Sequence, residues 1–344
     1  MMLGGLLPAS PAVAVGMIVV TTAVIWVGSG WLESSAEQLS AHYGLPPVVQ
    51  GSIVVAVGSS FPELASVIFT ALAGVFDMGV GGIVGSAIFN VLVIPAVAGL
   101  AATGNLETNR SLVYKEAQFY MIAVSALVIT FALGVIYIPA PETPPLVGQI
   151  TRPLAMIPLL LYGLYLFIQW QDVSEYTGDI ELNDAIGRQW ATLAGGLLLI
   201  LVGVEQLVSA VEILTHTFGI PEFLAGVTII AAVTSLPDTL VSVRAAREGR
   251  GLTSLGNVLG SNTFDLLVAI PIGVLLLGTV SINFAVAVPM FGVLTLATVL
   301  LFAFLRTDLS LTTPEAYALL VAYAVFLAWV VAETVGVLNL VAAT

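Results

Sequence analysis

The sequence predicts an all-α polytopic membrane protein whose ten transmembrane helices form two inverted-topology repeats of five helices. The first observation behind this prediction is the composition, because 59% of the 344 residues are hydrophobic and only 8% are charged. Soluble domains carry roughly a quarter charged residues, so a water-soluble globule of this size is excluded. Spans of ~20–25 residues fill most of the chain and leave room only for short connections.

The second observation is the number of long apolar runs. Each run is long enough to cross the hydrocarbon core of a bilayer. Several runs contain Gly, Pro, Ser or Thr, which a membrane helix tolerates where neighbouring groups satisfy the freed backbone. The ten predicted spans are residues 11–32, 46–75, 79–102, 114–137, 152–170, 190–217, 221–245, 254–278, 281–305 and 315–340.

Basic residues predict the orientation of the chain. If the N-terminus is extracellular, all eight Lys and Arg residues except Arg152 flank cytoplasmic connections, as the positive-inside rule requires. The triplet Arg244, Arg247 and Arg250 is interpreted as a topology anchor. The net charge of −13 excludes nucleic-acid binding, which needs a basic surface, and it suits a halophilic, high-salt host.

The third observation is an internal repeat at a shift of 175 residues. The sequence AVGSSFPE (56–63) aligns with AAVTSLPD (231–238), and GSAIFN (85–90) aligns with GSNTFD (260–265), without a gap. Because the copies lie five spans apart, they must run through the membrane in opposite directions. Inverted repeats with broken helices are typical of secondary transporters, whose site lies at the repeat interface near the midplane.

The repeat divides the chain into a first five-helix half, residues 1–171, and a second half, residues 190–344. An acidic cytoplasmic connection, residues 172–189, joins the two halves. Helices 2, 3, 7 and 8 are predicted to be broken. In helices 2 and 7, Pro62 and Pro237 each remove a backbone donor and free carbonyl groups just upstream.

Polar side chains gather at the predicted breaks in both copies. A carboxylate follows each proline directly, at Glu63 and Asp238. In the next span of each copy, two polar residues four positions apart share one face of the helix. The candidate ligands are Ser59, Ser60, Glu63, Ser86 and Asn90 in the first copy and Thr234, Ser235, Asp238, Ser261 and Asp265 in the second.

These groups suit a hard cation, because carboxylate, hydroxyl, amide and carbonyl oxygens are the ligands of Ca²⁺. The chain has no Cys and only two His, neither near the set, which disfavours zinc, copper and iron. A charge at mid-bilayer costs ~2.5 kcal/mol or considerably more, so three carboxylates there need bound cations or protons. An empty anionic site is costly to carry through an occluded state. Antiport, in which several Na⁺ or protons replace one Ca²⁺, follows from this charge count.

Other titratable residues in the spans are not among the candidate ligands. Glu205, near the middle of span 6, has Gly30 as its counterpart in the first copy, and its role is left unassigned. Positions at the membrane interface are expected for His42, His216, Glu116, Glu212, Glu222 and Glu333.

The paired motifs GSSFPE…GSAIFN and VTSLPD…GSNTFD resemble the two alpha repeats of the cation/calcium exchanger superfamily, and the prokaryotic sodium/calcium exchangers look most similar. The resemblance implies ten helices in two inverted halves, alternating access and exchange of Na⁺ for Ca²⁺. It also implies that Glu63 and Asp238 are the central acidic ligands and that Ser59 and Thr234 supply hydroxyls to the calcium site. The remaining implied ligands, for flanking sodium sites and the middle position, are Ser60, Ser86, Ser235, Ser261, Asn90, Asp265 and the carbonyls of Ala56 and Ala231.

Three residues depart from the family pattern: Asp238 replaces Glu, Ser59 replaces Thr and Ala87 replaces Asn. The shorter carboxylate changes the size of the site and bears on stoichiometry and selectivity. The PD and FD pairs of the second copy are similar to potassium-dependent sodium/calcium exchangers, so potassium cotransport stays an alternative. The acidic motifs of proton/calcium exchangers match less well, which disfavours proton coupling without removing it.

The function predicted from the sequence is therefore a sodium/calcium antiporter that exports Ca²⁺ in exchange for Na⁺. A potassium-dependent or proton-coupled exchanger is the alternative within transport. No enzymatic activity, cofactor or protein partner is expected, and the predicted location is the plasma membrane of a prokaryote. An intramembrane aspartyl protease would show a GxGD-type signature, which is absent around Glu63 and Asp238. A passive cation channel is the remaining alternative, recognisable by single-channel currents.

Overall fold

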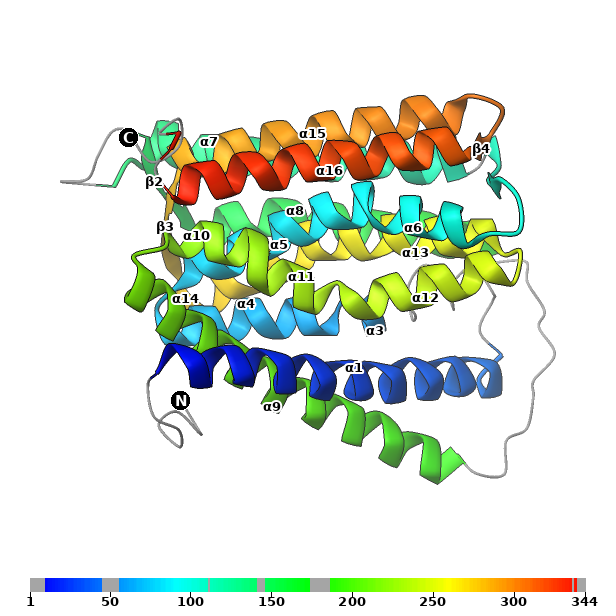
Figure 1. The fold of residues 1–344 in the computed structure, drawn as a ribbon, viewed down its shortest axis with the longest axis horizontal. Helices are drawn as coiled ribbons and strands as arrows, with labels where there is room; N and C mark the ends of the chain where they lie inside the picture. Colours follow the sequence, from blue (N-terminus) through cyan, green and yellow to red (C-terminus); the bar gives the residue numbers. More distant parts are fainter. Residues whose placement is uncertain are drawn as a thin grey trace.

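A computed structural model describes residues 10–44, 56–110, 112–140, 146–173, 186–335 and 337–338. These residues form a bundle of long helices with two short strand pairs (Figure 1). With π-helical segments labelled η, the elements are α1 (Pro11–His42), α3 (Ala56–Ser59), α4 (Phe61–Ala73), α5 (Phe76–Leu92), α6 (Ile94–Ala101), β1 (Leu106–Glu107), η2 (Leu112–Glu116), α7 (Ala117–Tyr137), β2 (Val147–Thr151), α8 (Arg152–Val173), α9 (Ile186–Phe218), α10 (Glu222–Ala225), η3 (Gly226–Ile230), α11 (Ala231–Thr234), α12 (Leu236–Arg247), α13 (Gly251–Phe264), η4 (Asp265–Ala269), α14 (Ile270–Leu277), β3 (Thr279–Asn283), α15 (Phe284–Arg306), β4 (Ser310–Leu311) and α16 (Thr313–Thr334).

Eight helices within the described residues are long and apolar enough to span a membrane, and the bent pair Glu222–Thr234 and Leu236–Arg247 makes a ninth. A shorter apolar helix, α4, lies within predicted span 2. Residues 46–55 of that span lie outside the described residues, as does most of the predicted acidic connection. The prediction of an all-helical, multi-pass membrane protein is confirmed, whereas the full set of ten spans stays a prediction.

Several helix boundaries differ from the predicted spans. Helix α1 continues to His42, well past the predicted end at residue 32, because Leu32, Ala36 and Leu39 stay buried at helical spacing. Helix α15 begins only at Phe284, because the residues before it form β3.

Two of the predicted helix breaks lie at serines beside the repeated prolines. Ser60 interrupts the helix between α3 and α4, and Ser235 separates α11 from α12 at a bend of 44°. The other two interruptions are milder. Val93 separates α5 from α6, and η4 widens its helix without ending it. Such π-helical segments are frequent at functional sites.

Two short antiparallel strand pairs, which the sequence did not predict, lie in the connections between helices. Strand β1 pairs with β4, and β2 pairs with β3, in which Gln149 lies opposite Ser281. The two pairs join connections at opposite ends of the bundle (Figure 1). Burial alternates along β2 and β3, as expected for strands with one covered face.

Helix α5 packs backbone against backbone on α10 and η3. A Cβ atom at Gly81 would lie 2.2 Å from Phe223 O, and one at Gly85 would lie 2.3 Å from Val227 O. Both distances are shorter than any tolerable contact, so glycine is required at these positions, as is common where membrane helices approach closely. The close contact between α5 and η3 brings Ser86, which follows Gly85, next to Ser235 of the second copy.

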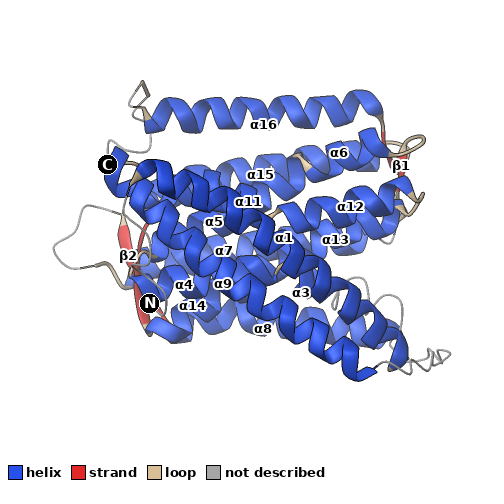
Figure 2. Ribbon diagram, turned by 60° about the horizontal axis from the view of Figure 1, so that its bottom comes forward, coloured by secondary structure: helices blue, strands red, loops and turns tan. Residues whose placement is uncertain are grey.

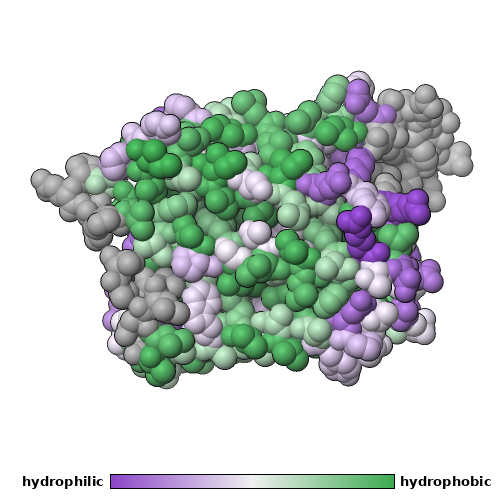
Figure 3. Space-filling view, turned by 90° about the horizontal axis from the view of Figure 1, so that it is seen from above, coloured by the Kyte–Doolittle hydropathy of each residue, from purple (hydrophilic) through white to green (hydrophobic). Residues whose placement is uncertain are grey.

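The helices form layers. Helices α1 and α9 cross on one face of the bundle, α16 lies on the opposite face, and α5 and α13 lie between them (Figures 1 and 2). Helices α4 and α12 run in opposite directions, as do α5 and α13 (Figure 1). Helices α12 and α15 finish with arginines in their last turns. Both end at the same end of the bundle, where hydrophilic residues gather (Figure 3).

Candidate ion-binding site

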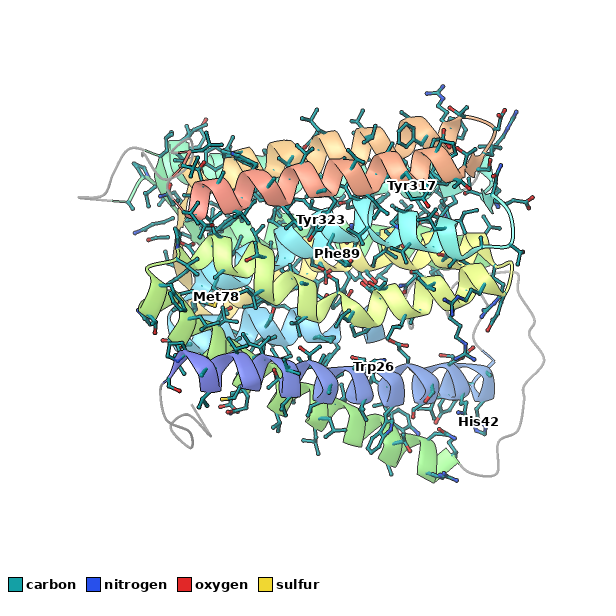
Figure 4. All side chains as sticks on the ribbon, viewed as in Figure 1. Trp26, His42, Met78, Phe89, Tyr317 and Tyr323 are labelled. Carbon is teal, nitrogen blue, oxygen red and sulfur yellow. The ribbon has the colours of Figure 1, made fainter. Side chains whose placement is uncertain are left out.

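The candidate ligands lie together in the interior of the bundle, on α3, α4, α5, α11, α12, α13, η4 and the residues that join them. Figure 4 shows oxygen atoms gathered near mid-height, close to Phe89. Ala56 is the first residue of α3. The other candidates expose no more than 1% of their surface: Ser59, Ser60, Glu63, Ser86, Asn90, Ala231, Thr234, Ser235, Asp238, Ser261 and Asp265.

Two serines link the repeats in nearly equivalent ways. Ser86 Oγ of α5 donates to Glu63 Oε1 at 3.3 Å and lies 2.7 Å from Ser235 Oγ of the second copy. Its repeat counterpart, Ser261 of α13, donates to Asp238 Oδ1 at 3.0 Å and lies 3.2 Å from a hydroxyl of the first copy. Each serine therefore joins the acid of its own copy to a hydroxyl of the other.

The Asp238 carboxylate is held by further donors. Asn90 Nδ2 donates to Oδ2 at 3.1 Å, and Asn257 Nδ2 donates to Oδ1 at 3.3 Å. Ser59 Oγ, which donates to Asn257 Oδ1 at 3.3 Å, also interacts with this carboxylate. Hydrogen bonds to a charged group contribute roughly 1.5–3 kcal/mol each. The described side chains therefore satisfy Asp238 on both of its oxygens.

Glu63 and Asp265 form a corner of the site that is not satisfied. Glu63 Oε2, both carboxylate oxygens of Asp265 and Asn90 Oδ1 are buried without a hydrogen-bond partner among the described residues. Glu63 and Asp265 also repel each other, and each is repelled by Asp238. The Ser60 hydroxyl interacts favourably with the Asp265 carboxylate, but its geometry does not meet that of a hydrogen bond. Leaving buried charges uncompensated costs several kcal/mol, so this corner favours a bound cation.

The repeat explains why the two acids differ. Asn90 and Asp265 occupy equivalent positions, and each interacts with the acid of the other copy. Asn90 donates to Asp238, whereas Asp265 repels Glu63. Of these two repeat-related contacts, the one between Asn90 and Asp238 is a hydrogen bond, whereas the one between Asp265 and Glu63 brings two like charges together.

Sequence reasoning missed Asn257, which contacts candidate ligands of both copies. Its amide bridges Asp238 and Ser59, and it also donates to Ser242 Oγ at 3.3 Å. The comparison of the copies passed over it because Gly82 is its counterpart. A signal was present, since Asn257 lies four residues before Ser261 and so shares its helix face.

Asn262 was missed for the same reason, because its counterpart is Ala87. Its Oδ1 accepts from Asn90 Nδ2 at 3.0 Å. Its Nδ2 donates to Ala87 O and to Tyr120 Oη, both at 3.2 Å. Asn262 therefore fixes the amide of Asn90, with its nitrogen toward Asp238.

The Thr234 hydroxyl and the Ala231 carbonyl each have a hydrogen-bond partner close by in the chain. Thr234 Oγ1 donates to Ile230 O at 3.1 Å and also interacts with Glu63. Ala231 O accepts from the Ser235 N–H at 3.1 Å. Their roles as ion ligands stay predictions.

Within the described residues, no group of three or more Asp, Glu and His side chains is close enough to ligate one metal ion. A Ca²⁺ ion at this site would therefore take a mixed shell, in which hydroxyl, amide and carbonyl oxygens supplement the carboxylates. Such mixed oxygen shells of 6–8 ligands are usual for Ca²⁺.

Two acids assigned to the interface have more buried surroundings than expected. Glu333 lies in the last turn of α16, at the end of its span, but it is only 3% exposed. Glu116 accepts hydrogen bonds from Gln169 Nε2 at 2.8 Å and Tyr165 Oη at 3.1 Å. Glu205 is half-buried and has no assigned role.

The family model described as sodium/calcium exchanger protein matches residues 13–171 and 188–332. The chain belongs to this family. The predicted superfamily is thereby confirmed, and the family consists of transporters that exchange cations rather than enzymes.

Relatives and solved structures agree with this membership. Sodium/calcium exchanger MaX1 of Methanosarcina acetivorans is 25% identical over 282 residues, which cover 70% of this chain and 76% of that protein. Sodium/potassium/calcium exchanger 5 of Homo sapiens is 26% identical over 337 residues, covering 68% of this chain and 64% of that protein. A structure of the sodium-calcium exchanger NCX_Mj matches with a TM-score of 0.64 at 22% identity, covering 93% of this chain and 99% of that chain. This last likeness shows that the exchanger fold is shared.

Proposed function

We propose that the chain is a sodium/calcium antiporter that exports Ca²⁺ from the cytoplasm in exchange for Na⁺. The observation that carries the proposal is the corner at Glu63 and Asp265, where buried carboxylate oxygens lack partners and like charges face each other. A cation bound there would remove the repulsion and supply the missing partners. The relative named sodium/calcium exchanger supports the choice of ions.

In this proposal the transported ions are held by the candidate ligands of both copies. Asp238 is the fixed acid, whose oxygens already accept hydrogen bonds, and Glu63 with Asp265 provides the free oxygens. The proposed ligand set is Glu63, Asp238, Ser59, Thr234, Ser60, Ser235, Ser86, Ser261, Asn90, Asp265 and the carbonyls of Ala56 and Ala231.

Alternating access in this proposal uses two inverted five-helix halves, residues 1–171 and 190–344, joined by the connection 172–189. The opposite directions of α4 and α12 support it (Figure 1), as does the match of the family model to two segments. The ten-helix count requires residues 46–75 to form one span, of which the first ten lie outside the described residues.

Antiport follows from the charges of the empty site. Three buried carboxylates repel one another, and moving them uncompensated through an occluded state costs several kcal/mol. A site that must stay occupied while it changes its access couples the exit of one cation to the binding of another. Continuous leak of a single ion is therefore disfavoured.

Potassium-dependent exchange is a second candidate, which a specific pair of residues favours. In the second copy, Asp238 follows a proline and Asp265 follows a phenylalanine, which gives the dipeptides PD and FD. The human relative is named a sodium/potassium/calcium exchanger. Addition of K⁺ to the assay below separates this candidate from simple sodium/calcium exchange.

The proposed location is the plasma membrane of a prokaryote, with the N-terminus outside. The arginine-rich ends of α12 and α15 would then face the cytoplasm. Accessibility of single engineered cysteines to a membrane-impermeant reagent tests this orientation, since the chain has no Cys of its own.

The test of the function is uptake of radioactive Ca²⁺ into proteoliposomes that contain the full chain. An outward Na⁺ gradient should drive uptake, and K⁺ should be required only if the second candidate holds. Glu63→Gln and Asp265→Asn should each abolish uptake, because each replaces a carboxylate whose oxygens lack partners among the described residues. Glu107→Gln, which neutralises an exposed acid, is the matched control.

The proposal fails if Glu63→Gln and Asp265→Asn both keep wild-type rates. Uptake driven by a pH gradient alone would assign the coupling to protons instead. Single-channel currents with uptake indifferent to counter-ions would show a passive channel.

A further inference from the structure

An open hollow of about 460 Å³ lies between helices α1 and α12, near the end of the bundle where α12 terminates. Trp26, labelled in Figure 4, contributes from α1. The other lining residues come from α12 and its cap: Leu240, Val243, Arg244, Arg247 and Glu248. The hollow is thus apolar on one side and basic on the other.

The charges at its rim do not balance. Glu248 pairs with Arg244 at 3.2 Å and also with Arg250, so one carboxylate serves two guanidinium groups. The bonds from Arg250 and Arg244 hold the pKa of Glu248 below its usual value, and it stays ionised. Glu33 of α1 also attracts Arg244. Arg247 is exposed and forms no ion pair with any residue that the structure describes.

The apolar wall indicates the kind of anion that fits. Of the apolar residues that line it, Trp26 is 55% exposed and Leu240 is 44% exposed. These residues lie on helices that are apolar enough to span a membrane. A small dissolved anion would contact the arginines and leave this wall uncovered, whereas a lipid covers both surfaces. Basic pockets between membrane helices bind anionic headgroups.

We propose that the hollow between α1 and α12 binds an anionic phospholipid. Arg247 and Arg244 hold the phosphate, and an acyl chain lies along Trp26 and Leu240. None of the lining residues is a candidate ion ligand, and the proposal is independent of which ions the protein exchanges.

Native mass spectrometry of the full chain in detergent measures the preference directly. With equal amounts of dioleoyl phosphatidylglycerol and dioleoyl phosphatidylcholine, one phosphatidylglycerol should be retained in preference. Arg247→Gln should weaken its binding about fivefold, and Arg244→Gln with Arg247→Gln about 25-fold, from the usual contribution of one arginine to anionic lipid binding. Arg110→Gln, an exposed arginine outside the hollow, is the matched control and should change nothing.

Fluorescence locates the bound lipid. A small fraction of brominated phosphatidylglycerol in phosphatidylcholine nanodiscs should quench tryptophan emission with a saturable component. Trp26→Phe should abolish that component, whereas Trp170→Phe, which changes another exposed tryptophan, should leave it in place.

Three results would overturn the proposal. Equal retention of the two lipids, or full retention by Arg247→Gln, would show that the arginines select no headgroup. Displacement of the lipid by millimolar inorganic phosphate or glycerol 3-phosphate would identify a soluble anion as the occupant. A dimer that forms without lipid and protects Trp26 from quenching would identify a second copy of the chain.

Discussion

Replacing Asp238 by Asn and Glu63 by Gln removes one negative charge in each case, but the two carboxylates differ in their hydrogen bonds. Asp238 accepts from two donors on Oδ1 and from Asn90 on Oδ2. An amide at position 238 must place its NH₂ group against at least one of these donors. Asn90 cannot turn to accept, because its nitrogen also donates to Asn262 Oδ1. Asn262 is fixed in turn by two acceptors of its own.

Glu63 offers the opposite case. Its Oε2 has no partner among the described residues, so the amide of a glutamine breaks no existing hydrogen bond there, and the bond from Ser86 to Oε1 is kept. The substitution also removes the repulsion by Asp265. A buried donor left without an acceptor costs roughly 1–3 kcal/mol, and bonds to a charged acceptor lose strength when it becomes neutral. Asp238→Asn should therefore destabilise the fold by about 2 kcal/mol more than Glu63→Gln.

The assay is reversible unfolding in mixed micelles without Na⁺ or Ca²⁺, so that ion binding does not contribute to the comparison. The difference corresponds to a factor of about 30 in the unfolding equilibrium constant. Both variants should lose transport. A difference in their unfolding free energies therefore reports on the assigned hydrogen bonds and not on activity. An equal or larger stability loss for Glu63→Gln would refute this reasoning.

Three further predictions concern residues around the site. Asn257→Ala should raise the Ca²⁺ concentration for half-maximal uptake about tenfold, from about 1.4 kcal/mol of lost hydrogen bonding. The control is Ser254→Ala, whose buried hydroxyl has no partner among the described residues, and an unchanged concentration for Asn257→Ala would contradict its assigned contacts. Gly85→Ala should destabilise the protein by about 1–3 kcal/mol, because the added methyl group would overlap the backbone of η3. Gly292→Ala, which has open space around it, is the control and should not destabilise the protein. Equal thermal unfolding temperatures for the two variants would argue against close packing at Gly85. Tyr120→Phe should cost about 1 kcal/mol of stability by removing an acceptor of a buried amide, and denaturant unfolding with no measurable loss would exclude that bond.

Much of the architecture could be predicted from local patterns. The apolar runs specify membrane helices, because a bilayer excludes unpaired backbone and most charges. The prolines specify where two helices break, because Pro62 and Pro237 each remove a backbone donor. The repeat then located Glu63 and Asp238 without any knowledge of contacts. The strand pairs escaped prediction, since β2 and β3 come from segments more than 100 residues apart and each is too short to be recognised alone.

The sequence by itself determined that the chain lies in a membrane, that it carries two related acid-bearing segments and that it resembles cation exchangers. Only the tertiary structure decided which acid is compensated and which is free. The pairing of Asn90 with Asp238 and the repulsion of Glu63 by Asp265 depend on distances between copies 175 positions apart. Those distances are set by backbone contact at Gly81 and Gly85. Hydrophobic periodicity and helix breaks are local properties, whereas electrostatic compensation depends on separation in space.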